Sequence, residues 1–229
     1  MDKYIWADPA QGSAFPVARP GYPIIAASAF VTLILALIGL KCLTLSALFV
    51  TGFICAFFRD PDRVTPDIEN AVICPADGRV VSASVVKENP FVTGPCMKVG
   101  IFMNVFNVHV NRIPVNGVIE SITYRPGRFL PADKTEASTK NEHNAIVIKM
   151  EDGTRVGVVQ IAGLVARRII CRKAESDSVA AGSRFGMICF GSRVDLYLPP
   201  DTRITVSAGE KVKAGSTIIG YLKKEDVSA

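Results

Sequence analysis

The chain has 229 residues, which is enough for one domain of ordinary size together with a membrane-associated segment. Its hydrophobic fraction of 49% and mean hydropathy of +0.30 are high for a soluble protein, and its formal net charge is +5. The basic residues are spread along the chain without a nucleic-acid-binding motif, so the charge favours anionic lipid, and no nucleic acid, as a partner.

The cysteines and histidines exclude several kinds of site. Six cysteines show neither the close pairs of a zinc site nor the density of a disulfide scaffold, so we expect reduced thiols. The two histidines, His109 and His143, do not stand at metal-ligand spacing, so we expect no metal. The chain also lacks a pyridoxal-phosphate lysine motif and a nucleotide-binding glycine fingerprint.

The first element along the chain is a hydrophobic segment, residues 22–58, which follows an N-terminal tail, residues 1–21. Lys41 is its only charge and divides it into two runs, each near the lower limit for crossing a bilayer core of roughly 30 Å. Two interpretations remain open: a helical hairpin that turns near Gly39 and Lys41, or an oblique anchor that never fully crosses. The segment is too long and starts too late for a signal peptide.

Positive charge flanks the hydrophobic segment on both sides. Lys3 and Arg19 precede it, and Arg59 and Arg63 follow it. Because positive flanks remain in the cytoplasm, both ends are expected there. We therefore expect the domain that follows the segment, residues 59–229, on the cytoplasmic face of a membrane.

From Arg59 onward the pattern is mainly short β-rich runs separated by Gly, Pro and Asn. It predicts a mainly β fold (β-rich α+β), built as a compact, mostly antiparallel barrel or sandwich. We expect a short helix at Leu164–Lys173 and an exposed polar loop with one helical turn at Pro131–Asn144. The expected strands are Arg79–Val86, Val115–Tyr124, Ala145–Met150, Arg155–Ala162, Arg193–Leu198 and Thr202–Val206.

The Gly191-Ser192 pair stands between two apolar, strand-like segments. A serine hydroxyl held against the preceding carbonyl can attack it, convert the amide to an ester and eliminate, and hydrolysis then leaves a pyruvoyl group. Gly191 removes a Cβ that would crowd this attack and tolerates unusual backbone angles. Three other Gly-Ser pairs in the chain are typical of ordinary turns, so the pair alone does not predict self-cleavage.

Several ordered motifs give the pair a context. They are FFRDPDR at 57–63, PADG at 75–78, NVHVNRIPVNG at 107–117, RRI at 167–169, FGMI at 185–188 and FGSRVD at 190–195. With these motifs, the chain resembles the short, bacterial and archaeal type of phosphatidylserine decarboxylase along almost its whole length.

The resemblance implies a proenzyme that is cut between Gly191 and Ser192. A large chain, residues 1–191, and a small chain, residues 192–229, would form a heterodimer, and a higher oligomer is left open. Ser192 would become a covalent pyruvoyl group that forms an imine with the substrate amine and stores the electron pair left by carbon dioxide. The implied reaction turns phosphatidylserine into phosphatidylethanolamine and CO2 without metal or pyridoxal phosphate.

His109 is the natural candidate for proton transfer, since an imidazole of pKa ~6.5 can shuttle protons at neutral pH. Asp77 could orient it, although Asp-Gly is also a favoured turn pair. By its register, His109 matches the first of two histidines in the longer bacterial members, the one that the family suggests for protonating the substrate, and Arg112 replaces the second. Either His109 serves both self-cleavage and protonation of the substrate, or backbone strain and a water molecule perform the cleavage. His143, expected on a loop, is the weaker alternative.

The substrate is expected to be a membrane lipid, because a soluble amino acid would leave residues 22–58 unexplained. Its phosphodiester needs a cation, although each arginine taken singly is more typical of a solvated surface. The candidates for binding phosphate are Arg59, Arg63, Arg167, Arg168 and Arg193.

The strand after Ser192 is expected to have one face in the core. Residues 194, 196 and 198 are expected to face the core, opposite residues 193, 195 and 197.

A second hypothesis is a membrane-anchored carrier or adaptor without catalysis. Residues 75–80 and 209–220 resemble the hairpins of lipoyl and biotinyl carrier domains, so we expect a fold like the lipoyl-type hammerhead. The modified lysine of such carriers has no counterpart, because Lys211 and Lys213 flank a valine in an expected strand. A likeness of fold carries no function by itself.

Overall fold

The computed structural model describes residues 4–6, 8, 16–87, 94–134, 136–164, 168–189 and 191–223. The chain divides into two compact units, which are described separately. The helical unit consists of Ala10–Asp62 and Phe106–Val108. The β-rich unit consists of Met1–Pro9, Arg63–Val105 and His109–Ala229.

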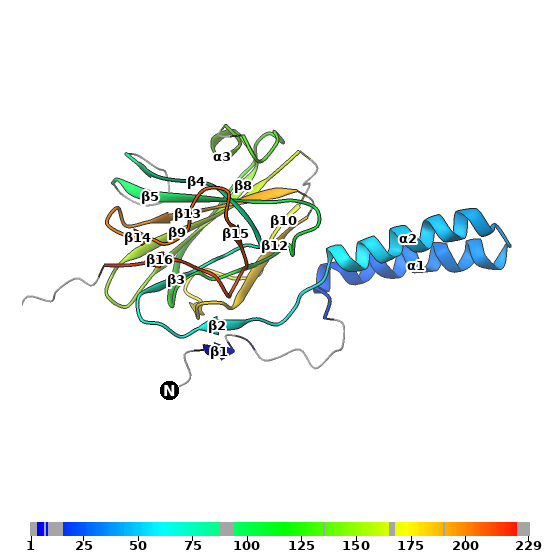
Figure 1. Cartoon of the computed structure of the whole chain (residues 1–229), viewed down its shortest axis with the longest axis horizontal. Helices are drawn as coiled ribbons and strands as arrows, with labels where there is room; N and C mark the ends of the chain where they lie inside the picture. The colour runs from blue at the N-terminus through cyan, green and yellow to red at the C-terminus, as the bar shows by residue number, and fades with distance from the viewer. Residues whose placement is uncertain are drawn as a thin grey trace, which may run out of the picture. The chain divides into compact units, whose positions relative to one another are not determined.

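The helical unit is a hairpin of two apolar helices, α1 (Tyr22–Leu37) and α2 (Lys41–Phe57), preceded by a 3-10 turn, η1 (Arg19–Gly21) (Figure 1). Gly39 lies in the connecting turn with φ of +80°, a conformation that favours glycine. Among the described helices, the stretch Arg19–Leu37 is long and apolar enough to cross a membrane, and Lys41–Phe57 is shorter. The segment therefore has the helical-hairpin form, and its crossing of a membrane stays a prediction.

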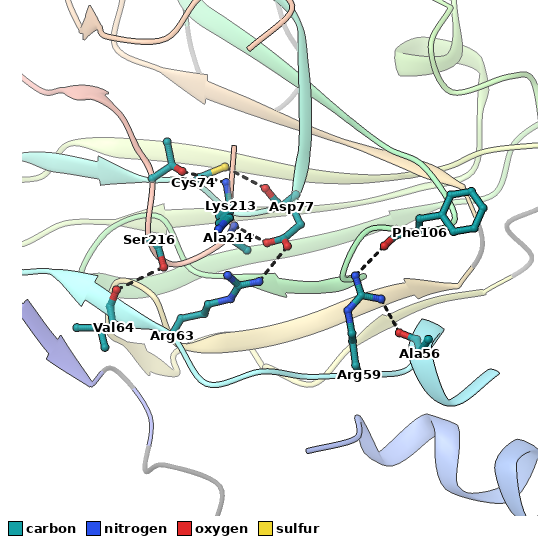
Figure 2. Close-up of polar contacts among 12 residues, drawn as sticks. Ala56, Arg59, Arg63, Val64, Cys74, Asp77, Phe106, Lys213, Ala214 and Ser216 are labelled. Atoms are coloured by element: carbon teal, nitrogen blue, oxygen red, sulfur yellow. Dashed lines mark hydrogen bonds and ion pairs between the residues drawn. The ribbon is translucent and has the colours of Figure 1, made fainter. Parts of the chain in front are cut away.

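Arg59 closes the end of α2. Its guanidinium donates hydrogen bonds to the carbonyl oxygens of Ala56 (2.5 Å) and Phe106 (2.7 Å) (Figure 2). The ring of Phe106 meets that of Phe53 edge to face, with centroids 6.2 Å apart. A cation suits the C-terminal end of a helix, where carbonyl groups lack partners. Arg59 therefore has a structural use within this unit.

The β-rich unit is built on one curled, eight-stranded antiparallel sheet (Figure 1). Runs rich in Val and Ile favour strands because branched side chains pack well on a pleated surface. One of its central strands, β13 (Ser192–Leu198), is paired on both sides, with β9 (Arg155–Ala162) and with β5 (Cys96–Met103). The spatial order is β11 (Ser178–Val179), β7 (Gly117–Arg125), β8 (His143–Lys149), β9 (Arg155–Ala162), β13 (Ser192–Leu198), β5 (Cys96–Met103), β4 (Gly78–Val86) and β15 (Lys211–Val212).

Smaller antiparallel sheets complete the described part of this unit. One has the order β10 (Arg168–Cys171), β12 (Arg184–Cys189) and β6 (Val110–Arg112), and another has β14 (Arg203–Ile204), β16 (Ile218–Tyr221) and β3 (Ala71–Ile73). β1 (Tyr4–Trp6) pairs with β2 (Val64–Pro66), and α3 (Ala137–Lys140) is one helical turn. The chain thus passes from β12 in a small sheet to β13 in the large sheet at Gly191-Ser192.

The central strands are buried on both faces. The main core packs large-sheet residues such as Ile101 and Val194 against Phe185 and Ile188 of β12. On the opposite face a smaller cluster contains Cys96, Ala145, Val159, Ile161 and Tyr197. Residues 194, 196 and 198 face the main core as predicted, and their neighbours in β13 are buried as well.

The structure confirms a mainly β domain, and the six predicted strands match β4, β7, β8, β9, β13 and β14 within two residues at each end. The predicted helix Leu164–Lys173 is wrong, because Arg168–Cys171 pairs with β12 as a strand. The predicted loop Pro131–Asn144 contains its helical turn, α3. However, its last part is not exposed, since Asn141 is buried and β8 already begins at His143. Likeness to the lipoyl-type hammerhead stays a prediction.

Candidate active site

Ser192 is the first residue of β13, and its strand partners determine which way its side chain points. It pairs with Ala162 of β9 and with Met103 of β5, both of which belong to the main core. Residues directly opposite one another in adjacent strands share a face of the sheet. The side chain of Ser192 therefore points into the interior, and the residue is 0% exposed.

The hydroxyl of Ser192 has no hydrogen-bond partner within the described part of the chain. A buried polar group left in this way costs about 1–3 kcal/mol, and a catalytic role is one reason for a protein to retain it. Gly191, just before it, has φ of +53°, in the left-handed region that favours glycine. Both features suit a hydroxyl held for reaction with the carbonyl of the preceding residue.

His109 reaches the same interior from the small sheet. It directly precedes β6, and two residues further on Asn111 accepts a hydrogen bond from Gln160 Nε2 of β9 (2.8 Å). Asn111 Nδ2 also contacts the Sδ of Met103, the strand partner of Ser192, at 3.8 Å. Alternate residues of an extended segment share a face. His109, which is 0% exposed, therefore faces the interior that contains Ser192.

His143 lies on the other face of the large sheet. The prediction that it lies on a loop is wrong: it begins β8, is buried, and its Nδ1 lies 2.8 Å from the carbonyl oxygen of Asn141. His143 is opposite Ile161, which in turn is opposite Arg193. Because successive side chains of a strand point to opposite faces, His143 and Arg193 face away from the side of Ser192.

Asp77 lies in the turn before β4 (Figure 2). Its Oδ2 accepts a hydrogen bond from Arg63 (2.9 Å), and its Oδ1 accepts one from the backbone N–H of Ala214 (2.7 Å). In the same segment, Cys74 Sγ donates to the carbonyl of Ala76 at 3.0 Å. Asp77 thus links the turn to the segment after β15, and its predicted part in orienting His109 stays a prediction.

Arg112 is buried on β6, at the position of the second histidine in the longer members of the resembled family. It donates a hydrogen bond to the carbonyl oxygen of Gly182 (2.8 Å), and it lies 3.8 Å from Asp8 Oδ2. A guanidinium stays protonated at neutral pH, so it cannot accept a proton from Ser192. The chain therefore has no base at position 112.

Comparison with known proteins identifies the family of the chain. The family model described as phosphatidylserine decarboxylase matches residues 50–220. The chain belongs to the phosphatidylserine decarboxylase family. This confirms the predicted family and, with it, the class of carboxy-lyases.

Relatives that are named phosphatidylserine decarboxylase proenzyme align with most of the chain. The protein from Desulfotalea psychrophila is 47% identical over 207 residues, which cover 90% of this chain and 97% of that protein. The one from Syntrophus aciditrophicus is 48% identical over 206 residues, with coverage of 89% and 96%. The one from Burkholderia mallei is 46% identical over 209 residues, with coverage of 91% and 96%.

The arginines predicted to bind the phosphate of phosphatidylserine differ in exposure and in their contacts within the protein. Arg167 lies outside the described residues. Arg168 is exposed at the start of β10 and lies opposite Cys189 of β12, three residues before Ser192. The predicted arginines with internal contacts are Arg59, Arg63 and Arg193.

Arg193 is part of a buried charge cluster on the face away from Ser192. Its Nε bonds Asp195 Oδ1, and its guanidinium donates to Ser82 Oγ (3.2 Å). The Nζ of Lys98 lies 2.9 Å from Asp195 Oδ2. The guanidinium of Arg193 also lies so close to Gly100 that a side chain there would displace it. The cluster fixes the first residues of β13 from the side opposite the reacting group.

We expect Asp195→Ala to lower the free energy of unfolding by about 3–5 kcal/mol, because it removes the carboxylate that pairs with the buried Arg193 and with the partly buried Lys98. The measurement is thermal unfolding in detergent, in a Ser192→Ala background that keeps the chain in one piece. Glu120→Gln is the control, since Glu120 pairs with Arg155 (2.7 Å) at an exposed site, where ion pairs contribute little. Equal melting midpoints for the two variants would contradict this role of the cluster.

Cys189 lies two residues before Gly191 and could compete as a nucleophile. Burial raises the pKa of its thiol, and the nearby charge of Arg168 offsets the rise only in part. Because the thiolate is the reactive form, a raised pKa keeps this sulfur unreactive at neutral pH. Ser192 therefore has no thiolate competitor at this position.

Buried amide side chains are the part of the site that the sequence reasoning missed. Gln160 forms hydrogen bonds with both Asn111 (2.8 Å) and Asn144 (3.2 Å), and it lies opposite Val194, on the face of the sheet that carries Ser192. One available signal was Gln160 itself, a single polar residue inside the apolar run 156–162. A polar residue in a run that is otherwise buried indicates a hydrogen-bonded network.

Proposed function

We propose that this chain is a self-processing, pyruvoyl-dependent decarboxylase that converts phosphatidylserine into phosphatidylethanolamine and CO2. The observation that carries the proposal is the buried Ser192 hydroxyl, which has no hydrogen-bond partner in the described part of the chain and follows a glycine in the left-handed conformation. The proenzyme names of the relatives agree with it.

The proposed cleavage needs only the chain and water. The Oγ of Ser192 forms a bond to the carbonyl carbon of Gly191, the C–N bond breaks, and the hydroxyl proton passes to the nitrogen, which gives an ester and an amine. Loss of the Cα proton of Ser192 then breaks the Cβ–Oγ bond and releases Gly191 as a carboxylate. The elimination leaves residue 192 as dehydroalanine, which tautomerises to an imine. Water adds to this imine, ammonia leaves, and residue 192 becomes a pyruvoyl group.

Pairing of β13 on both sides would hold the new terminus. Ser192 bridges Met103 and Ala162, so cutting the chain before it leaves both ladders of hydrogen bonds intact. The pyruvoyl group supplies a carbonyl that captures the substrate amine and withdraws the electron pair left by CO2. His109 would deliver the proton to the carbon that has lost its carboxylate, because it faces the same interior.

The substrate is proposed to reach the site from the membrane. Exposed apolar side chains along α1 and α2, such as Phe30 (64% exposed) and Phe49 (79% exposed), suit a lipid environment. With basic residues on both flanks of the hairpin, the catalytic domain is proposed to face the bacterial cytoplasm. After cleavage, residues 1–191 and 192–229 would remain together as a heterodimer.

Arg168 is proposed to bind the substrate phosphate. We expect Arg168→Ala to raise the KM for phosphatidylserine roughly tenfold or more, because a charge-assisted hydrogen bond is worth about 1.5–3 kcal/mol. Initial rates in mixed micelles measure this effect. Arg172→Ala removes an exposed arginine from the same segment and is the control. An unchanged KM in Arg168→Ala would exclude this role.

The function itself is tested with phosphatidylserine labelled at the carboxyl carbon and presented in mixed micelles. We expect labelled CO2 and an equal amount of phosphatidylethanolamine, and no turnover of free serine. A protein that releases no CO2 from the lipid would contradict the proposal and would favour the carrier or adaptor hypothesis.

A further inference from the structure

We infer that Gly163 and Asn141 are positioning residues for self-cleavage, which hold the carbonyl group of Gly191 in place for attack. The inference rests on the proposed cleavage between Gly191 and Ser192. It assigns a function to the end of β9 and to the segment before β8, neither of which contributes a reacting atom.

Gly163 lies directly against the scissile bond. It follows Ala162, the strand partner of Ser192, so it comes opposite Gly191 one position further along. A Cβ added to Gly163 would overlap the carbonyl oxygen of Gly191 and come within 3.0 Å of the carbonyl carbon. The φ of Gly163 is not in the left-handed region, so this close approach, and not the backbone angle, requires a glycine.

Ala132 forms the other side of this contact. Its Cβ would lie 3.1 Å from a Cβ on Gly163, so residue 163 is enclosed between Ala132 and the Gly191 carbonyl. Ala132 is 4% exposed, which leaves little room to move away. The carbonyl of Gly191 thus rests against a backbone surface whose position depends on how the segment around Ala132 is held.

Asn141 holds that segment. It is 1% exposed, and its Nδ2 donates hydrogen bonds to the carbonyl oxygens of Ala162 (2.7 Å) and Leu130 (2.8 Å). Its Oδ1 accepts a hydrogen bond from the N–H of Leu130 (3.0 Å). One side chain therefore ties the end of β9, just before Gly163, to the segment that leads to Ala132.

The position of the carbonyl matters most in the first step of cleavage. The Oγ of Ser192 must approach the carbonyl carbon of Gly191 along a narrow range of directions, while the C–N bond breaks and the hydroxyl proton moves to the nitrogen. Misplacing reacting groups by about 1 Å can slow a reaction roughly 100-fold. A methyl group at position 163 would impose a displacement of that order, because Cβ atoms do not approach other atoms so closely.

The test uses the full chain made by cell-free translation with lipid vesicles, so that cleavage is followed from the moment of synthesis. We expect Gly163→Ala to be cut roughly 100-fold more slowly than the wild type. Hydroxylamine, which cuts esters, should release no additional fragment that begins at residue 192, because the slow step comes before the ester and no ester accumulates.

Asn141→Asp gives a second test that adds no volume. It keeps an acceptor for the Leu130 N–H but replaces the NH2 group that donates to two carbonyl oxygens. We expect slower cleavage and the same resistance to hydroxylamine. This variant tests the inference even if Gly163→Ala does not fold.

Two control variants separate positioning from general destabilisation. Gly220→Ala places a Cβ 2.6 Å from the carbonyl oxygen of Arg203 in another sheet, and Asn116→Ala removes a side-chain bond to the N–H of Ala181 (2.8 Å). Both should be cut at the wild-type rate, whatever their melting midpoints.

Three results would overturn the inference: wild-type cleavage in Gly163→Ala and Asn141→Asp, fragments released from them by hydroxylamine, or equally slow cleavage in the controls. An intact wild-type chain would instead contradict the proposed function itself.

Discussion

Replacing Ser192 with alanine should leave a single chain of 24.6 kDa and no decarboxylation above background. The physical reason is that alanine has no hydroxyl group, so the amide before it cannot become an ester and no carbonyl group can form at residue 192. Gel electrophoresis and CO2 release from labelled phosphatidylserine measure the two effects.

Ser183→Ala is the matched control for this prediction. Ser183 also follows a glycine and is also buried, but its Oγ donates a hydrogen bond to the carbonyl of Ala180 (2.6 Å). We expect this variant to be cut and active. Two chains from Ser192→Ala would show that the scissile bond lies elsewhere.

Removing the imidazole of His109 should reduce decarboxylation by at least about 100-fold, because general acid catalysis contributes roughly 10²–10⁴-fold. The loss is expected whether or not His109→Ala is cut, so the rate is expressed per small chain, with the small chain quantified by mass spectrometry. A low rate of decarboxylation per small chain would show that His109 acts on the substrate, and not only in the cleavage of the chain.

His143→Ala is the control, since His143 is also buried but lies on the face of the sheet that does not carry Ser192. We expect it to retain a turnover rate near that of the wild type for each small chain formed. Wild-type turnover in His109→Ala, together with loss of turnover in His143→Ala, would contradict the role of His109 and would assign protonation of the substrate to His143.

Local pattern predicts five strands of the large sheet, β4, β7, β8, β9 and β13, and it predicts the bounds of β9 to the residue, but it does not predict β5. Val and Ile dominate Arg155–Ala162, and the segment ends where the apolar run meets glycine. Local pattern wrongly predicts a helix at β10, because the segment is short and its strand conformation depends on pairing with β12, a separate segment of the chain. Local propensity does not contain that pairing.

Ser192 and His109 could be selected from the sequence because each stands in a motif of the resembled family. Their common interior could not be predicted, since it depends on the contact of Asn111, on a small sheet, with Gln160, on the large one. The positions of Asn141 and Gly163 beside the scissile bond could not be predicted for the same reason. Their partners, Leu130 and Gly191, are set by tertiary structure and not by spacing along the chain.

Intact mass spectrometry of the purified wild-type protein tests the central claim most directly. The account predicts two polypeptides, of which the smaller contains residues 192–229 and carries a pyruvoyl group in place of an amino terminus. A single continuous chain through Gly191 and Ser192 that still releases CO2 from phosphatidylserine would contradict it.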